Sequence, residues 1–201
     1  RRLRDAARSV GCSPFVIAKI ERSRALQNIE SILEAADGIM IARGDLGVEI
    51  PIEKMAIAQK MLMHKANLVG KPVITATQML ASMVNNPRPT RAEVTDVANA
   101  ILDGTDATML SGETAVGRYA REAVRTMARI ATVTERSMPY ADWLRSASLA
   151  GSRGVTGAIS QVACELASEL EAHAIVASTF SGGTARWVAS HRPSTPIVAP
   201  T

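Results

Sequence analysis

The alternation of short apolar runs with longer segments of helical spacing constrains the fold of this chain most strongly. The runs that we expect to form strands are Phe15–Ile20, Gly38–Ala42, Pro72–Ala76 and Ala107–Leu110. The segments with helical spacing are Ser23–Ala35, Glu53–Leu68, Glu93–Leu102 and Ala120–Arg136. Parallel strands need long crossovers, usually helices, so this order predicts a parallel α/β sheet. The strands are apolar at nearly every position, which predicts cover on both faces, as in an α/β barrel or a doubly wound sheet.

A change of pattern divides the chain into two predicted domains. Residues 139–157 carry Pro, Ser, Gly and scattered charge without a period, which is typical of a linker between residues 1–138 and 158–201. The second domain is predicted to contain a helix, a strand, a helix and a strand, near Ala158–Leu170, Ala174–Ser178, Thr184–His191 and Pro196–Ala199. This is one βαβ element with a preceding helix.

Composition argues against two classes of partner. No apolar run approaches the roughly 20 residues of a membrane helix, so we expect no membrane span. The net charge is only +4 and aromatic residues are 3% of the chain, so surfaces on which nucleic-acid bases could stack are scarce. The densest basic stretch, Arg1, Arg2, Arg4 and Arg8, has the spacing of the solvated face of an amphipathic helix. We therefore expect no nucleic-acid partner.

The cysteines and histidines carry no pattern of a metal site or a disulfide framework. Cys12 and Cys164 lie far apart, which favours a reducing compartment such as the cytoplasm. The three isolated histidines, which we interpret as structural, are His64, His173 and His191. The chain begins on Arg rather than Met and stops directly after an apolar run, so we expect it to be a piece of a longer protein.

Polar groups follow each of the first four strands. The strands lead into Lys19-Ile20-Glu21, Arg43-Gly44-Asp45, Thr77-Gln78 and Ser111-Gly112-Glu113-Thr114. Since the carboxyl ends of parallel strands lie side by side, we expect these groups to converge at one edge of the sheet, the carboxyl rim. Gly and Asp are also ordinary turn residues, and solvated loop starts are the simpler interpretation for Glu113 and Thr114.

The residue types at the carboxyl rim suit a metal-assisted reaction of an anion. Lys19 and Glu21 are two apart on an extended segment and so point to one face. Glu21 and Asp45 suit Mg²⁺, which takes one or two carboxylates and keeps water and substrate oxygens as its other ligands. Lys19 would place a fixed positive charge beside an oxygen or phosphoryl group. The turn N–H groups of Gly44 and Asp45 could bind a carboxylate or phosphate, with the Thr77 hydroxyl beside them.

Five stretches of this sequence closely resemble the pyruvate kinase family. They are "IAKIE", "GIMIARGDLGVEIP", "GKPVITATQML", "NPRPTRAEVTDVANAILDGTDATMLSGETA" and the Thr-x-Ser-Gly loop at Thr179. The resemblance implies the C-terminal half of a (β/α)₈ TIM barrel followed by part of a second α/β domain. It implies phosphoryl transfer from phosphoenolpyruvate to ADP, giving pyruvate and ATP in glycolysis. It also implies a cytoplasmic location and a homo-oligomer, usually a tetramer.

The resemblance also implies roles for individual residues. Lys19 matches the catalytic lysine, Glu21 and Asp45 match Mg²⁺ ligands, and Gly44, Asp45 and Thr77 match the residues that hold the substrate's carboxylate and phosphate end. The family's K⁺ ligands and much of its nucleotide site belong to earlier strands, which this chain does not include. Half an active site is therefore expected here.

In the second domain the resemblance points to a possible effector or anion loop. Its residues are Thr179, Ser181, Gly182 and Thr184, just before a helix whose free N–H groups favour anions. Many family members bind a sugar bisphosphate there. Gly183 stands where Arg or another residue is common, so an ordinary strand-to-helix turn is an equal alternative. Ala120, where the family usually has Pro, affects only the entry to a helix.

Two other functions stay open at this point. A non-catalytic half barrel could bind a metal or an anion, or associate with a complementary chain, because open sheet edges and an uncovered apolar interior favour association. A carbon–carbon lyase acting on pyruvate or phosphoenolpyruvate would use similar carboxylates, but it explains neither Lys19 beside Glu21 nor the long matching stretches.

Overall fold

A four-stranded parallel sheet organises the first of the two units into which the computed structural model divides, Arg1–Ser137 and Met138–Thr201. The structure describes residues 2–149 and 154–200. The strands are β1 (Ile17–Ile20), β2 (Gly38–Ala42), β3 (Val73–Ala76) and β4 (Ala107–Met109), and each pairs with the next in chain order. Lys19 lies opposite Met40, which in turn lies opposite Ile74. Successive parallel strands of an α/β barrel have this order.

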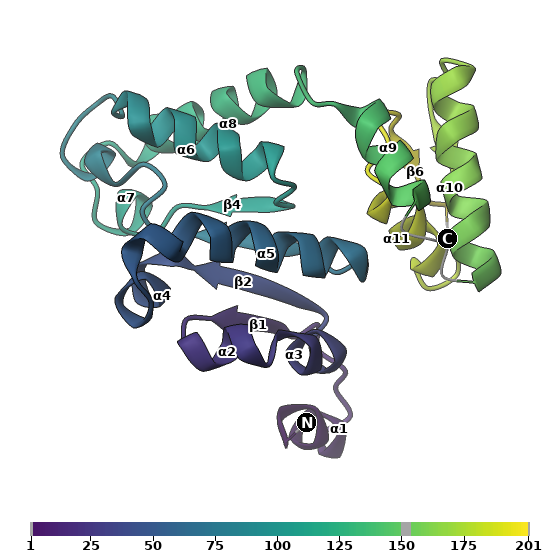
Figure 1. Ribbon diagram of the computed structural model, residues 1–201, viewed down its shortest axis with the longest axis horizontal. Coiled ribbons are helices and arrows are strands. Elements are labelled where there is room, and N and C mark those ends of the chain that lie inside the picture. The colour runs from purple at the N-terminus through teal and green to yellow at the C-terminus, as the bar shows by residue number, and fades with distance from the viewer. Residues whose placement is uncertain (1, 150–153, 201) are drawn as a thin grey trace. The chain divides into compact units, whose positions relative to one another are not determined.

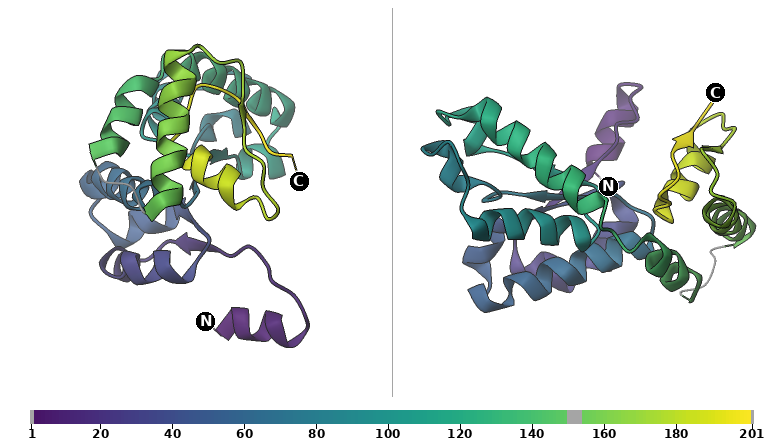
Figure 2. Two further views of the ribbon diagram at one scale, coloured as in Figure 1. Left: turned by 90° about the vertical axis from the view of Figure 1, so that its right-hand side faces the viewer. Right: turned by 90° about the horizontal axis from the view of Figure 1, so that it is seen from above.

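Helices occupy every connection between these strands (Figure 1). Helices α2 (Ser23–Gln27) and α3 (Ile29–Ala35) join β1 to β2, α4 (Arg43–Glu49) and α5 (Met55–Leu68) join β2 to β3, and α6 (Arg91–Leu102) joins β3 to β4. Helix α1 (Arg2–Ser9) precedes β1, α7 (Gly112–Ala115) and α8 (Ala120–Glu135) follow β4, and the 3₁₀ turns are η1 (Ile52–Lys54) and η2 (Ala81–Val84). Helix α5 packs against β2 and β3, and α6 packs against β4. The single helix expected over Ser23–Ala35 is interrupted at Asn28. Helix α1 lies apart from the strands at the end of an extended segment (Figure 2).

Burial separates the inner strands from the outer ones. Ile39, Ile41 and Val73 on β2 and β3 have no solvent exposure, whereas Ile17 on the outer strand β1 is 40% exposed. Leu62 and Met63 of α5 are fully buried as well. Ile39, Ile41 and Val73 share one face of the sheet, which is therefore fully covered, whereas Met40 and Ile74 on the opposite face are only half-buried.

A capping residue links helix α6 to the segment that follows β3. Thr90 and Glu93 form the reciprocal capping box expected from their spacing. Glu93 also accepts hydrogen bonds from the backbone N–H (2.7 Å) and the hydroxyl (2.6 Å) of Ser82 in η2. Burial opposes ionisation of Glu93, but the hydrogen bonds from Ser82 and Thr90 outweigh it and hold the pKa of this carboxyl below its usual range.

The second unit builds a small core between helices and a two-stranded parallel sheet. Its elements are α9 (Tyr140–Leu149), α10 (Gly154–Glu169), β5 (Ile175–Val176), α11 (Gly183–Ser190) and β6 (Ile197–Val198). Cys164, Ile175 and Val188 belong to that core. Burial raises the pKa of the Cys164 thiol to about 11, so it stays uncharged at neutral pH and packs as a small apolar group.

The linker prediction for residues 139–157 needs a correction. Helix α9 occupies Tyr140–Leu149, and α10 already begins at Gly154. Leu144 of α9 is buried in the second unit's core, so packing holds a segment that its composition alone describes as irregular. Part of the expected linker therefore belongs to the second unit. In the described part of the chain, no helix is both long enough and apolar enough to cross a bilayer.

Candidate functional site at the carboxyl ends of the strands

Lys19, near the end of β1, lies between two carboxylates. Its ammonium nitrogen is 2.5 Å from Glu21 Oε2 and 3.1 Å from Asp45 Oδ2. The hydrogen bond to Glu21 and then that to Asp45 raise the pKa of Lys19 above its usual value, so it is fully charged at neutral pH. All three side chains are substantially exposed, so the cluster contributes little to stability. What the cluster does is bring Lys19 and Asp45, which are 26 positions apart in the sequence, together at one exposed point of the rim.

The segment after β2 is a helix, where the sequence predicted a flexible turn. Helix α4 begins at Arg43, directly after Ala42 of β2, and Asp45 lies in its first turn. Leu46 is fully buried and anchors the helix despite the two glycines, Gly44 and Gly47. Negative side chains are favoured near a helix N-terminus, so Asp45 is well placed there.

Gly44 and Thr77 are joined by a direct hydrogen bond. The backbone N–H of Gly44 donates to Thr77 Oγ1 at 2.7 Å, and this hydroxyl donates to the carbonyl of Ala76 at 2.6 Å. A Cβ atom at position 44 would lie 3.4 Å from Thr77 Oγ1, which is an ordinary contact distance. Thr77 itself has a φ of 69°, in the left-handed region.

Arg43 also reaches the residues after β3, although the sequence indicated only that it follows a strand and gave it no role. Its guanidinium donates to the carbonyl oxygens of Thr77 and Gln78 and pairs with Asp96 of α6. Only 9% of its side chain is exposed. An arginine at the end of a strand resembles any solvated loop residue, and its partners are 16 to 53 positions away, so no local signal identifies it.

Glu113 corrects the expectation of a solvated loop start. This side chain is 2% exposed and accepts hydrogen bonds from the backbone N–H groups of Leu80 (3.0 Å) and Ser111 (2.9 Å). It thereby ties the segment after β3 to the segment after β4. Thr114, its neighbour, is exposed as expected.

The donor set at the rim fits a hard cation that keeps its water. Glu21 and Asp45 present carboxylate oxygens on both sides of one ammonium group, where they face solvent. Within residues 2–149 and 154–200, no three His, Cys, Asp or Glu side chains are grouped as a metal site. Two exposed carboxylates suit Mg²⁺ and do not suit a closed zinc site.

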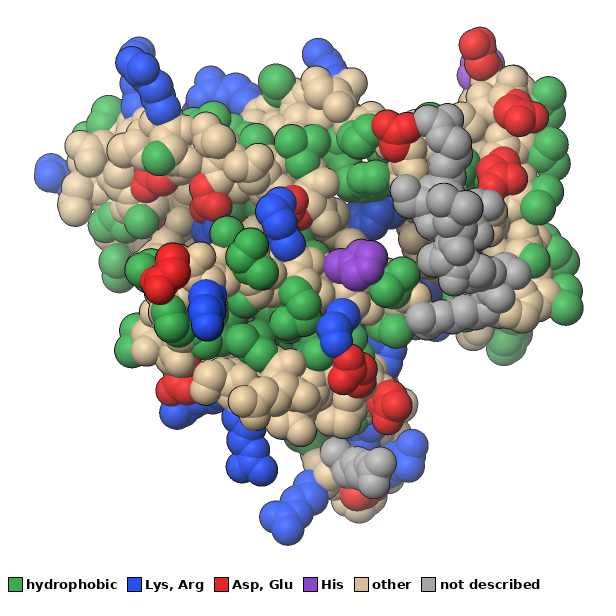
Figure 3. All heavy atoms as spheres, in the orientation of Figure 1, with side chains coloured by type: hydrophobic (Ala, Val, Ile, Leu, Met, Phe, Trp, Pro, Cys, Tyr) green, Lys and Arg blue, Asp and Glu red, His purple; other side chains and the backbone are tan. Residues whose placement is uncertain are grey.

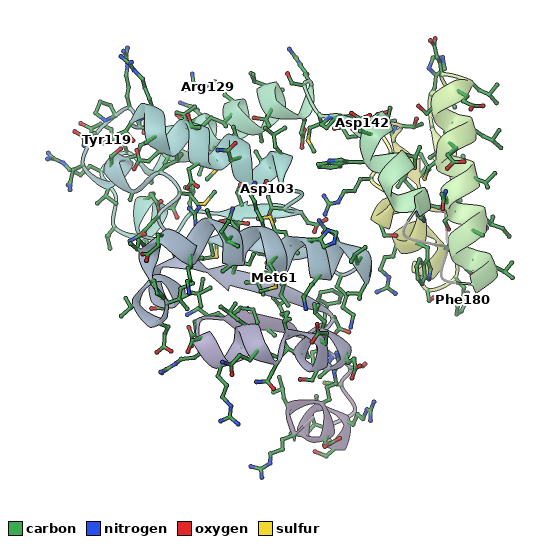
Figure 4. All side chains as sticks on the ribbon, in the orientation of Figure 1. Met61, Asp103, Tyr119, Arg129, Asp142 and Phe180 are labelled. Atoms are coloured by element: carbon green, nitrogen blue, oxygen red, sulfur yellow. The ribbon has the colours of Figure 1, made fainter. Side chains whose placement is uncertain are left out.

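The loop of the second unit has few side-chain contacts of its own. Gly182 has a φ of 76° and forms the N-terminal cap of α11 without a side-chain hydrogen bond. The contacts at its neighbours are a long bond from Arg186 to the Ser181 carbonyl (3.4 Å) and one from the Thr179 N–H to the Pro200 carbonyl (3.2 Å). Phe180, labelled in Figure 4, is fully exposed.

A parallel strand–helix sheet with charged groups gathered at its carboxyl rim defines part of an α/β barrel of the enzyme type. The family model described as "Pyruvate kinase, barrel domain" matches residues 1–124, and "Pyruvate kinase, alpha/beta domain" matches residues 157–201. The chain belongs to the pyruvate kinase family.

Individual relatives agree with this assignment. The pyruvate kinase of Geobacillus stearothermophilus is 56% identical over 186 residues, which are 92% of this chain and 32% of that protein. The Clostridium acetobutylicum enzyme is 52% identical over 92% of this chain and 39% of its own length. A crystal structure of a pyruvate kinase from Cryptosporidium parvum superimposes with a TM-score of 0.92 at 44% identity, covering 98% of this chain and 40% of that one. The chain thus spans between a third and two fifths of these relatives.

Proposed function

We propose that this chain is part of a Mg²⁺-dependent pyruvate kinase, which transfers the phosphoryl group of phosphoenolpyruvate to ADP and gives pyruvate and ATP. The observation that carries the proposal is the Lys19 ammonium between Glu21 and Asp45 at the carboxyl rim of a pyruvate kinase barrel segment. A fixed cation beside two metal-binding carboxylates suits a group that gains negative charge during transfer.

Each side chain at the rim has a separate role in this proposal. Lys19 stabilises charge on the transferred phosphoryl group and on the enolate oxygen that develops. Glu21 and Asp45 would hold Mg²⁺, which would supply Lewis-acid stabilisation of substrate oxygens. Because both carboxylates now contact Lys19, that ammonium has to leave their shared position before a second cation can occupy it.

Gly44, Asp45 and Thr77 form the substrate-binding part of the proposal. Their N–H and hydroxyl groups would hold the carboxylate and phosphate end of the substrate. Thr77 Oγ1 already accepts the hydrogen of the Gly44 N–H, so a substrate oxygen at this point competes with that hydroxyl. Binding therefore turns the Thr77 hydroxyl from an acceptor toward Gly44 into a partner of the substrate.

Several family properties belong to the same proposal without a residue of this chain to carry them. They are the K⁺ requirement, the homo-oligomer and the cytoplasmic location. The binding of a phosphorylated effector, also part of the proposal, would use Thr179, Ser181, Gly182 and Thr184. The free thiols of Cys12 and Cys164 agree with a reducing compartment.

A non-catalytic role has one observation in its favour, the exposed apolar surface. Phe15 and Ile17 beside the outer strand β1 are 55% and 40% exposed. On α10, Val155, Ile159, Val162 and Leu166 are each about half exposed or more, and Figure 3 shows apolar side chains in a row along this helix. Such surfaces favour association with another chain.

A coupled assay of pyruvate formation, with phosphoenolpyruvate, ADP, Mg²⁺ and K⁺, tests the proposal on three samples. The first is this chain alone. The second adds the portion of the Geobacillus stearothermophilus relative that precedes the matched segment. The third is a chimera in which residues 1–201 replace the matched segment of that relative. Turnover by the chimera supports the proposal. A folded chimera without turnover, beside an active parent enzyme, refutes it and leaves the non-catalytic role.

A further inference from the structure

Two consecutive residues after β3, Thr77 and Gln78, have left-handed backbone conformations. Their φ angles are 69° and 54°, and neither residue is a glycine. A residue other than glycine is destabilised in this conformation and persists in it only where its surroundings hold it in place. The segment that carries the Thr77 hydroxyl, which is proposed to bind the substrate, is therefore strained, and contacts with other residues must hold it in this conformation.

The guanidinium of Arg43 contacts the carbonyl groups of both strained residues. Its Nε and Nη2 atoms donate to the Thr77 carbonyl oxygen at 3.2 and 3.0 Å, and Nη2 donates to the Gln78 carbonyl oxygen at 3.1 Å. These carbonyls, which would repel an anionic substrate, are thus paired with a buried positive charge. A rigid fork of N–H groups makes this set of bonds, and the single ammonium of a lysine cannot reproduce it.

Asp96 of α6 fixes the orientation of that fork. Nη1 of Arg43 lies 2.8 Å from Asp96 Oδ1 and 2.7 Å from Oδ2. The carboxylate balances the charge of a guanidinium that is nearly removed from solvent. Elements that follow β2 and β3 are thereby joined to α6 through one side chain.

We propose that Arg43 is a positioning residue that, together with Asp96, holds the Thr77–Gln78 pair and so places Thr77 Oγ1 against Gly44. The inference rests on the proposed function of this site. Arg43 and Gly44 are adjacent at the start of α4, and both contact Thr77. The Arg43 side chain donates to the Thr77 carbonyl, and the Gly44 N–H donates to the Thr77 hydroxyl. The substrate-binding groups of α4 and of Thr77 are kept in register by this double contact.

The test uses the chimera with Arg43→Lys and, as a matched control, with Arg4→Lys. Arg4 makes the same kinds of bond, to the Ala35 carbonyl (3.1 Å) and to Asp37 (2.6 Å), but it lies where β2 begins, away from the carboxyl rim. We expect Arg43→Lys to lower kcat/KM for phosphoenolpyruvate roughly 10- to 100-fold, since small displacements of positioned groups have effects of this size. Arg4→Lys should leave kcat/KM unchanged.

A crystal structure of the Arg43→Lys chimera gives the second readout. We expect Thr77 or Gln78 to leave the left-handed region and Thr77 Oγ1 to move out of hydrogen-bond distance of the Gly44 N–H. Adding Gln78→Gly, which adopts a positive φ without strain, should recover part of the lost kcat/KM. Unchanged φ angles and an unchanged Oγ1 position in Arg43→Lys would overturn the proposal, whatever the activity. An inactive unsubstituted chimera would refute the proposed function, and the two backbone conformations would still decide the role of Arg43.

Discussion

The carboxyl rim of the first unit and the loop before α11 in the second unit both place small polar residues at the end of a parallel strand. They differ in how the backbone is held. At the rim, the buried charged groups of Arg43 and Glu113 bind main-chain groups from two neighbouring segments. In the second loop, Gly182 supplies a left-handed turn and Phe180 faces solvent. Buried side chains thus hold the backbone at the rim, whereas the loop before α11 has a glycine turn at its end.

This difference teaches that exposed polar residues alone do not define a site. The groups that we expect to contact a substrate, Lys19 and Asp45, are exposed at the rim, while their supports are buried. Preorganisation of this kind lets a site stabilise charge without rearranging during the reaction. Changes at the rim should therefore affect the supporting backbone and, in the proposed reaction, turnover, whereas a change at Gly182 should affect the stability of the second unit.

The largest effect is expected for Lys19→Met in the chimera. In the proposed reaction Lys19 acts on charge that develops during transfer, so kcat should fall by roughly 10²- to 10³-fold with a smaller change in KM. Steady-state kinetics over a range of phosphoenolpyruvate concentrations measures both constants. Lys54→Met, which removes another exposed lysine of the same unit, serves as the control and should leave both unchanged. An unchanged kcat for Lys19→Met would remove Lys19 from the reaction.

Glu113→Ala should produce the largest loss of stability. It leaves the buried N–H groups of Leu80 and Ser111 without their acceptor, at a cost of about 3 kcal/mol for the pair. Amide hydrogen exchange on the 201-residue chain should show these two amides losing protection. Thr114→Ala, one position along and exposed, should leave both amides protected. Retained protection of both amides in Glu113→Ala would mean that the Glu113 carboxylate is not needed to stabilise this part of the backbone.

The sequence predicted the strands well because each inner strand is an uninterrupted apolar run, fully buried on one face and half-buried on the other. β2 has the bounds that its composition indicated, and β3 and β4 differ by one residue at one end. Helix α4 was missed because two glycines lower its propensity, and it is the burial of Leu46 that stabilises it. Helix α9 was also missed, because the burial of Leu144 that stabilises it depends on tertiary packing.

The candidate site was predictable only where its residues follow the strands. Lys19, Glu21 and Asp45 were expected at one rim, since parallel strands bring their ends together, and the structure places all three in contact. The supporting roles of Arg43 and Glu113 could not be identified, because their partners Asp96 and Leu80 lie on other segments. Their burial is likewise not encoded in the neighbouring sequence. Exposed groups at strand ends can thus be inferred from order along the chain, while their buried supports depend on the folded structure.

A smaller effect is expected for Gly182→Ala in the second loop. A side chain at a φ of 76° is strained, so the second unit should lose about 1 kcal/mol of stability. Gly183→Ala is the matched control: its Cβ would lie 3.5 Å from Ser181 Oγ, an ordinary contact, and alanine favours the helix. Both tryptophans, Trp143 and Trp187, belong to the second unit, so fluorescence during urea unfolding reports its stability. Equal losses of stability in the two variants would show that the left-handed conformation of Gly182 is not what makes this position sensitive.

The smallest effect concerns the acid sensitivity of the second unit. Burial lowers the pKa of His191 below its usual 6.5, although a hydrogen bond to the Gly157 backbone and the charge of Glu165 oppose this. Among the described residues, its buried Nε2 atom has no hydrogen-bond partner, so a proton there has no acceptor. As the pH falls, His191 is therefore protonated in the unfolded chain before it is protonated in the folded chain. The stability that the neutral histidine allows is fully present above pH 6.5 and declines as the pH falls toward the folded-state pKa.

Tryptophan fluorescence at a series of pH values should show this decline in stability, and His191→Gln should reduce it. His173→Gln, an exposed histidine of the same unit, should leave the decline intact, and an equal response of both variants would assign the acid sensitivity elsewhere.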